Sequence, residues 1–357
     1  SNVNCITEED YENYTDWYES AYTGLLTRSG DIDIFLLNSM DDKAYKILKD
    51  HYFEDLSQDE QLMGYFDAMY PQMREWSKCG DEIFGLPFYI GYPMGILVDE
   101  ERMGSVGYTM EDIGTVGGLL DFCGAWGERN TTPPTEQTLY VHFYYYNYIL
   151  TNYNRDTGEL NLDTPQFRSL LAQCRQYRDT ECLQDDDDLP YLELDKPVLL
   201  CTGRPMVDKE NFTLGYYPLL EGEAPGTKRY ADIRYFIINP SSKNKEQAFK
   251  YMNLLAETTK YNRWACDPLF REKEFYQSDL LLGGNYVTHD RRYSEEQFAM
   301  VNPFLEEQYV GYGFPGFSEI RRILYEYIED GNQTMDEAIA EAQNLLDTIR
   351  QEQYIGE

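Results

Sequence analysis

Asp31-Ile-Asp-Ile-Phe-Leu-Leu37 is the stretch of sequence that most clearly indicates a strand of an α/β fold. This short, mostly apolar run lies between Gly30 and Asn38-Ser39, and such turn residues around an apolar run predict a buried parallel strand. In open α/β sheets, ligands bind beyond the carboxyl ends of the strands. We therefore expect the polar residues Asn38 and Ser39 to lie at the mouth of a binding site.

Strand-like and helix-like segments alternate along the rest of the chain, which predicts an α/β fold. Ser57 to Trp76 is expected to be helical, and Ile233 to Ile238 is expected to form a strand. A helix is predicted to begin after Thr164, where a hydroxyl cap precedes proline at the first helical position. Another is predicted after Thr334, which forms a capping box with Glu337. The length of 357 residues favours two domains.

Composition excludes several classes of function. The chain has 30 Lys and Arg against 64 Asp and Glu, and its net charge of −34 would repel nucleic acids and anionic lipids. No window of eighteen residues is apolar enough to predict a transmembrane helix. The seven cysteines are scattered without any Cys-x-x-Cys pair, so no structural zinc is expected. We expect neither a metal nor a cofactor.

Sequence signatures of common enzymes do not occur. The chain lacks a Gly-x-Ser-x-Gly elbow, a phosphate-binding loop and a His-Glu-x-x-His pair. Paired carboxylates carry no signal, since 64 acidic residues always supply some pair at a suitable separation. The excess of tyrosine, 33 residues, favours a ligand with apolar faces and hydroxyl rims, as sugars have. These observations favour a binding protein rather than an enzyme.

Five stretches of the chain resemble the extracellular solute-binding proteins of sugar ABC importers, the superfamily that includes the maltose-binding proteins. The likeness extends in order over nearly the whole sequence. The stretches are Ser29-Gly-Asp-Ile-Asp-Ile-Phe35, Ile83-Phe-Gly-Leu-Pro87 leading to Leu97, Asn161-Leu-Asp-Thr-Pro-Gln-Phe167, Ile238-Asn-Pro-Ser-Ser-Lys-Asn-Lys-Glu-Gln-Ala248, and Gly331-Asn-Gln-Thr-Met-Asp-Glu-Ala338.

The resemblance implies a two-lobed, type II periplasmic-binding-protein-like fold that closes on its ligand about a hinge. It implies an N-terminal lobe of residues 1–93 and 239–309, and a C-terminal lobe of residues 94–238 and 310–357. The lobes would be joined by three crossings, near Pro87 to Gly95, Phe236 to Pro240 and Tyr309 to Phe317. Compared with the family, an N-terminal strand and helix of about forty residues are expected to be missing, because Val3 to Ile6 resembles the second strand.

The resemblance also implies a location and a set of partners. The protein is expected outside the membrane, held by an N-terminal lipid-bearing cysteine or retained in the periplasm. Its partners would be a small-molecule ligand, most simply a sugar, and the permease subunits of an ABC importer. The protein itself is expected to be a monomer. Three alternatives remain open, namely another polar solute such as a peptide or amino sugar, an interaction scaffold without a small ligand, and a glycoside-active enzyme.

Position by position, the resemblance implies a set of ligand contacts near the crossings. Aromatic rings would pack on sugar faces, and amide, carboxylate and guanidinium groups would bind the hydroxyls. A cradle is expected in which Tyr89 or Tyr92 and Trp264 face Tyr144 or Tyr230. The full set of expected contacts is Asn38, Ser39, Tyr89, Tyr92, His142, Tyr144, Arg204, Tyr230, Asp232, Trp264 and Phe317.

Overall fold

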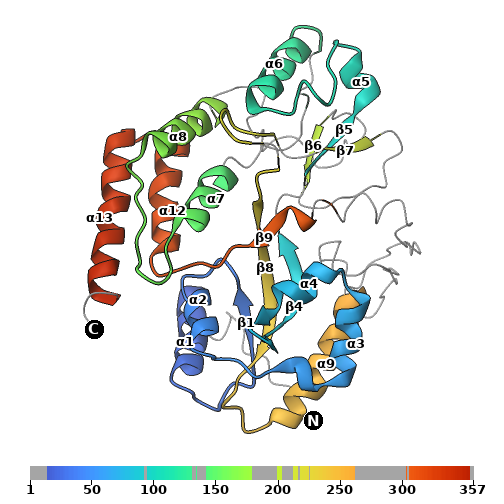
Figure 1. Cartoon of the computed structure of the whole chain (residues 1–357), viewed down its shortest axis with the longest axis vertical. Coiled ribbons are helices and arrows are strands. Elements are labelled where there is room, and N and C mark those ends of the chain that lie inside the picture. The colour runs from blue at the N-terminus through green and yellow to red at the C-terminus, as the bar shows by residue number, and fades with distance from the viewer. Residues whose placement is uncertain are drawn as a thin grey trace.

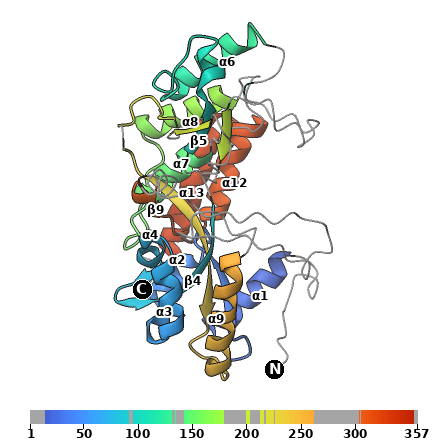
Figure 2. The same cartoon turned by 90° about the vertical axis from the view of Figure 1, so that its right-hand side faces the viewer.

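Two separate hydrophobic cores organise the chain in its computed structural model. The structure describes residues 14–91, 95–130, 134, 142–178, 199–202, 212–215, 218–224, 226–261, 303 and 305–353. One core contains Leu37, Phe66 and Tyr235, and the other contains Phe122, Tyr145 and Phe317. In both views the two groups of elements lie at opposite ends of the molecule (Figures 1 and 2). The described part of the chain therefore forms two lobes.

The sheet of the N-terminal lobe has β8 at its centre. The strand order is β1 (Ile34–Asn38), β8 (Arg229–Ile238), β4 (Leu86–Gly91), and both outer strands run antiparallel to β8. Among the described strands β1 therefore pairs only antiparallel, which differs from the buried parallel strand that the sequence predicts. Phe35 and Leu37 enter the core, whereas Leu36, which points to the other face, is 36% exposed.

Helices cover the buried face of this sheet. The expected helix from Ser57 to Trp76 is divided at Tyr70, because Pro71 requires an extended residue before it and begins a new helix. The short strands β2 (Lys78–Cys79) and β3 (Glu82–Ile83) form a hairpin beside these helices. The helical elements are α1 (Tyr14–Leu26), α2 (Ala44–Lys49), η2 (Leu56–Gln58), α3 (Glu60–Ala68), α4 (Pro71–Trp76) and α9 (Lys245–Tyr261).

The C-terminal lobe combines a small sheet with a group of helices. Strand β5 (Gly95–Asp99) pairs antiparallel with β6 (Leu199–Thr202) on one side and β7 (Phe212–Gly215) on the other. The helices are α5 (Glu100–Gly104), α6 (Val116–Gly127), α7 (His142–Asn152), α8 (Pro165–Arg178), α12 (Phe317–Tyr325), the π-helical turn η4 (Glu326–Asp330) and α13 (Met335–Gln353). Among the described residues, no helix has the length and apolarity needed to cross a membrane.

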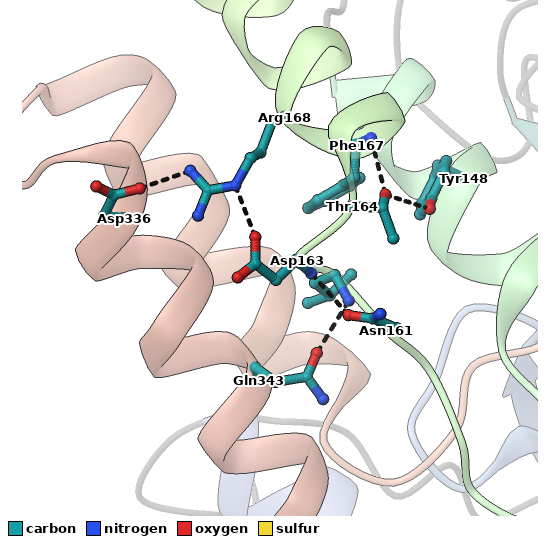
Figure 3. Close-up of polar contacts among 9 residues, drawn as sticks. Tyr148, Asn161, Asp163, Thr164, Phe167, Arg168, Asp336 and Gln343 are labelled. Carbon is teal, nitrogen blue, oxygen red and sulfur yellow. Dashed lines mark hydrogen bonds and ion pairs between the residues drawn. The ribbon is translucent and has the colours of Figure 1, made fainter.

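Both predicted helix caps are confirmed. The Thr164 hydroxyl accepts a hydrogen bond from the Phe167 N–H at 3.1 Å, so it caps α8 (Figure 3). The Thr334 hydroxyl accepts from the Glu337 N–H at 3.3 Å, and the Glu337 carboxylate accepts from the Thr334 N–H at 2.8 Å. Local hydrogen bonding thus fixes where α8 and α13 begin.

The stretch around Asn161 also joins α8 to α13. The Gln343 side-chain oxygen on α13 accepts a hydrogen bond from the Leu162 N–H at 2.9 Å. Arg168 on α8 forms ion pairs with Asp163 at 2.6 Å and with Asp336 on α13 at 2.5 Å (Figure 3). This stretch therefore positions the two helices relative to each other.

In the described part of the chain, three connections pass between the lobes. The first links β4 to β5. The second is the start of β8, since Tyr230 belongs to the C-terminal core and Ala231 to the N-terminal core. The third follows β9 (Gln308–Val310), which runs parallel to the start of β8 and leads to α12. The second crossing differs from the expected position at Phe236 to Pro240, because β8 pairs with β1 and β4 over most of its length.

Candidate functional site

Polar and aromatic side chains from both lobes meet where β8 begins. We call this group the junction cluster. Successive strand residues point to opposite faces, so Tyr230, Asp232 and Arg234 share the face of β8 that turns away from the N-terminal core. The members of the cluster are Ser39, Tyr89, His142, Tyr146, Tyr230, Asp232, Arg234, Phe317 and Arg321.

Asp232 forms the buried floor of the junction cluster. Only 7% of its surface is exposed, and its carboxylate accepts a hydrogen bond from the Ser39 hydroxyl at 3.4 Å. The Ser39 oxygen in turn accepts from the Ile233 N–H at 3.0 Å, so the end of β1 is tied to β8. Burial raises the pKa of the Asp232 carboxyl, although the positive charges of Arg234 and Arg321 and the Ser39 hydrogen bond act in the opposite direction.

Arg321 extends from α12 of the C-terminal lobe over two aromatic rings. Its guanidinium carbon lies 4.4 Å from the ring centre of Tyr146 and 5.3 Å from that of Phe317. Within the described part of the chain, its Nε atom is buried without a hydrogen-bond partner. The next residue, Arg322, pairs instead with Glu319 and Glu326 at the surface.

His142 and Tyr230 are the other residues that the C-terminal lobe contributes to its side of the junction cluster. The His142 ring centre lies 5.0 Å from that of Tyr146, which is 6.2 Å from that of Tyr230. Burial and the positive charge of Arg321 lower the pKa of His142 to about 3. The imidazole is therefore neutral at pH 7, where it offers one hydrogen-bond donor and one acceptor.

Arg234 and Tyr89 form the side of the N-terminal lobe. The Arg234 guanidinium carbon lies 4.7 Å from the ring centre of Tyr89, which is on β4 next to β8. Arg234 is exposed, and Tyr89, His142 and Arg321 are partly exposed. These four side chains form an accessible rim above the buried floor, and they offer cations, an aromatic face and an imidazole to a ligand.

Most of the expected contact residues that the structure describes belong to the junction cluster, although their roles differ. Ser39 and Phe317 are fully buried and Tyr230 is 2% exposed, so they support the rim rather than form it. Asn38 forms a turn, in which its side-chain oxygen accepts a hydrogen bond from the Met40 N–H at 2.9 Å. Tyr92, Arg204 and Trp264 lie outside the described residues, so the cradle that includes Trp264 stays a prediction.

Tyr144 lies on a different face of α7 from Tyr146. Its hydroxyl donates to the Pro218 carbonyl at 2.8 Å, and it lines a pocket of about 440 Å³ between α7, α8 and residues 220–227. The Glu223 carboxylate, held by Arg229 at 2.6 and 2.7 Å, forms part of the pocket wall. The expectation that Tyr144 belongs to the same contact set as Tyr230 therefore differs from the structure.

Sequence reasoning missed Tyr146, Arg234 and Arg321. A weak signal for the two arginines exists in the spacing, because Arg321 follows Phe317 by one helical turn and Arg234 follows Asp232 by two strand positions. Charged residues at such positions usually face solvent, so the pattern alone does not select them. In the described residues, no group of three or more His, Cys, Asp and Glu side chains is arranged to hold a metal ion.

Comparison with solved structures shows which fold the chain has. The maltose-bound MalE3 of T. maritima superposes with a TM-score of 0.63 at 14% identity, covering 94% of this chain and 89% of that one. A chitin oligosaccharide binding protein gives 0.62 at 13% identity, with 94% and 88% covered. An ABC transporter solute binding protein of Agrobacterium vitis S4 with bound D-mannitol gives 0.60 at 13% identity, with the same coverage. No family model and no curated protein matches the sequence.

Proposed function

We propose that this chain, which has the two-lobed fold of ABC transporter solute-binding proteins, captures a carbohydrate between its lobes and delivers it to an importer. The observation that carries the proposal is the junction cluster. Its rim is built by both lobes, with Tyr89 and Arg234 on one side and His142 and Arg321 on the other. A ligand that contacts both lobes binds the closed state better than the open one, and this difference drives closure.

The chemistry of the rim suits a sugar. The Tyr89 ring supplies an apolar face, and the neutral His142 imidazole and the two guanidinium groups supply hydrogen bonds for hydroxyls. The T. maritima, chitin oligosaccharide and A. vitis proteins are each described with a sugar or sugar alcohol as ligand, which supports the same class here. Binding without chemical conversion is part of the proposal.

The proposal extends to the place of action and the partners. We infer that the natural protein acts outside the cytoplasmic membrane, held there by an N-terminal lipid anchor or free in a periplasm. Its partners would be the permease subunits of an ABC importer, to which the closed, loaded form would bind. Recovery of the natural protein from the cytosolic fraction would contradict this part.

Thermal-shift screening with a carbohydrate panel tests the proposed function. A sugar that binds only the folded protein raises the midpoint of unfolding in proportion to its concentration and affinity. We expect stabilisation by at least one sugar and recovery of that sugar unchanged. Formation of a product would indicate an enzyme, and a complete lack of stabilisation would favour a scaffold.

A matched pair of variants locates the ligand. Ser169 lines the 440 Å³ pocket beside Tyr144, so Ser169→Trp fills that pocket without touching the junction cluster. Tyr89→Ala removes the aromatic face of the rim. The proposal requires sugar binding to be weakened by Tyr89→Ala and retained by Ser169→Trp. The opposite result would move the ligand to the pocket in the C-terminal lobe.

A further inference from the structure

We propose that the ligand of the junction cluster is an acidic sugar, whose carboxylate pairs with the guanidinium group of Arg321. This inference rests on the proposed function and names the class of sugar.

Among the described residues Arg321 forms no ion pair, although the chain is rich in carboxylates. The sequence contains 64 Asp and Glu residues, yet among the described residues no carboxylate oxygen lies within ion-pair distance of Arg321. The neighbouring Arg322 forms two ion pairs from the same helix. Because a partly buried charge is costly unless it is paired and hydrogen-bonded, the lone guanidinium group indicates a partner that binds from solution.

Arg234 adds a second cation at the rim. It stacks over Tyr89 and forms no ion pair with a described carboxylate. The anion nearest to both arginines is Asp232, which lies below the rim and is 7% exposed. Two arginines and one aspartate leave at least one uncompensated positive charge, since His142 is neutral at pH 7.

The chemistry of guanidinium favours a carboxylate as the missing group. Arginine presents parallel N–H donors that match the two oxygens of a carboxylate, and such charge-assisted pairs are stronger than hydrogen bonds to neutral hydroxyls. A negative charge on the ligand also offsets positive charge that Asp232 leaves uncompensated in the cluster. The rest of the sugar would then lie along the Tyr89 ring, where an apolar face can stack.

The negative charge of the whole protein means that an acidic ligand needs a local group of cations to bind. A net charge of −34 opposes the approach of any anion, so an acidic ligand binds only where fixed cations outweigh the surrounding carboxylates. The rim of the junction cluster meets that condition with Arg234 and Arg321. By contrast, the described lining of the pocket beside Tyr144 includes Glu221 and Glu223 and contains neither lysine nor arginine, so it is less suited to an acidic sugar than the rim is.

Calorimetry on the full chain with matched sugars tests the inference. The probes are glucose, glucuronate and glucose 6-phosphate, and galactose, galacturonate and galactose 6-phosphate, together with neutral and uronate trisaccharides. We expect a uronate to bind at least tenfold more tightly than the neutral sugar of the same configuration. Arg321→Gln should reduce that preference to near unity, whereas Arg322→Gln, the matched control on the same helix, should keep it.

Arg321→Lys keeps the inference testable if Arg321→Gln does not fold, because it preserves the charge and should retain part of the preference. A neutral sugar that binds as tightly as its uronate overturns the inference and leaves the proposed function intact. The inference is also overturned if Arg321→Gln still prefers the uronate to the neutral sugar, or if a phosphate ester binds more tightly than the uronate. In both cases the proposed function stays intact. Failure of every sugar to bind contradicts the proposed function itself.

Discussion

At the scale of single residues, burial sets the chemistry of the junction cluster. The Asp232 carboxyl has a raised pKa because it is buried, and His142 has a lowered one for the same reason. Both shifts move the groups toward their neutral forms. The charges that remain at the rim are those of Arg234 and Arg321, whose guanidinium groups do not lose their protons in proteins.

The pKa of His142 predicts a dependence of stability on pH. In the unfolded chain His142 takes up a proton as the pH falls below its ordinary pKa of 6.5, whereas in the folded protein it does so only near pH 3. The unfolded state therefore binds more protons between these values, and the free energy of unfolding falls as the pH is lowered through this range. At pH 5 the loss from this group is on the order of 1 to 2 kcal/mol.

Chemical denaturation of the natural chain and of His142→Gln at pH 7.5 and pH 5 measures this contribution. The difference between the two proteins isolates His142, because all carboxylates are common to both. The stability of His142→Gln relative to the natural chain should increase by about 1 to 2 kcal/mol at the lower pH. Equal changes in both proteins would show that the His142 pKa is not lowered.

Tyr89 provides the test of the aromatic face at the rim. If a sugar stacks on this ring, Tyr89→Ala should weaken binding of a verified ligand by roughly 1 to 3 kcal/mol, the scale of burying one large apolar side chain. Tyr325→Ala is the matched control. Tyr325 is the last residue of α12, is 48% exposed and is not a member of the junction cluster. Calorimetry that gives the same affinity for both variants would remove stacking from the account.

At the scale of helices and strands, local hydrogen bonds could be predicted from the sequence and long-range pairing could not. Thr164 and Thr334 mark helix starts because their hydroxyl groups bond to N–H groups three residues away. The partner of β1 is β8, about 200 residues further along the chain, and nothing within residues 31–37 specifies its direction. For this reason the apolar pattern of residues 31–37 predicts the strand but not its antiparallel pairing with β8.

The cap of α8 gives a prediction at this scale. Thr164→Ala removes an oxygen that accepts from the Phe167 N–H and that also lies 3.0 Å from the Tyr148 hydroxyl. We expect the free energy of unfolding to fall by about 1 to 2 kcal/mol. Thr164→Ser keeps the hydroxyl and should retain most of the stability in the same urea titration.

The ion pairs beside this cap should contribute much less. Arg168 bridges Asp163 and Asp336, but the two carboxylates are 60% and 80% exposed. Exposed ion pairs typically contribute between about 0 and 1 kcal/mol, so Asp336→Asn should change the free energy of unfolding by less than Thr164→Ala does. A larger loss in Asp336→Asn would mean that the α8–α13 contact depends on this network rather than on the cap.

The same difference of scale explains what could be predicted of the site. The resemblance pointed to the segments that carry Asp232, Tyr230 and His142, although it placed the second crossing at Phe236 to Pro240 rather than at the start of β8. Arg321 was missed because its role depends on two features of the tertiary structure, its position over the Tyr146 ring and a buried Nε atom that has no hydrogen-bond partner among the described residues. Neither fact is encoded in the spacing along α12.

At the scale of the whole molecule, two cores with three crossings provide the basis for a hinge. The second crossing lies between Tyr230 and Ala231, within a single strand that takes part in both lobes. Strand β9, which leads into the third crossing, is tied to α7, because the Tyr309 hydroxyl donates to the Asn147 side-chain oxygen at 3.0 Å and also shares a hydrogen bond of 3.0 Å with the Thr151 hydroxyl. A rotation about these crossings would bring the two sides of the junction cluster together while leaving both cores intact.

Small-angle X-ray scattering of the free and the ligand-saturated protein shows directly whether both lobes close on one ligand. The sugar is the one found by thermal-shift screening, and calorimetry defines the concentration that saturates the site. The account predicts a smaller radius of gyration when the ligand is bound, and no change when a non-binding sugar is added at the same concentration. An unchanged radius of gyration in a fully saturated protein would contradict it.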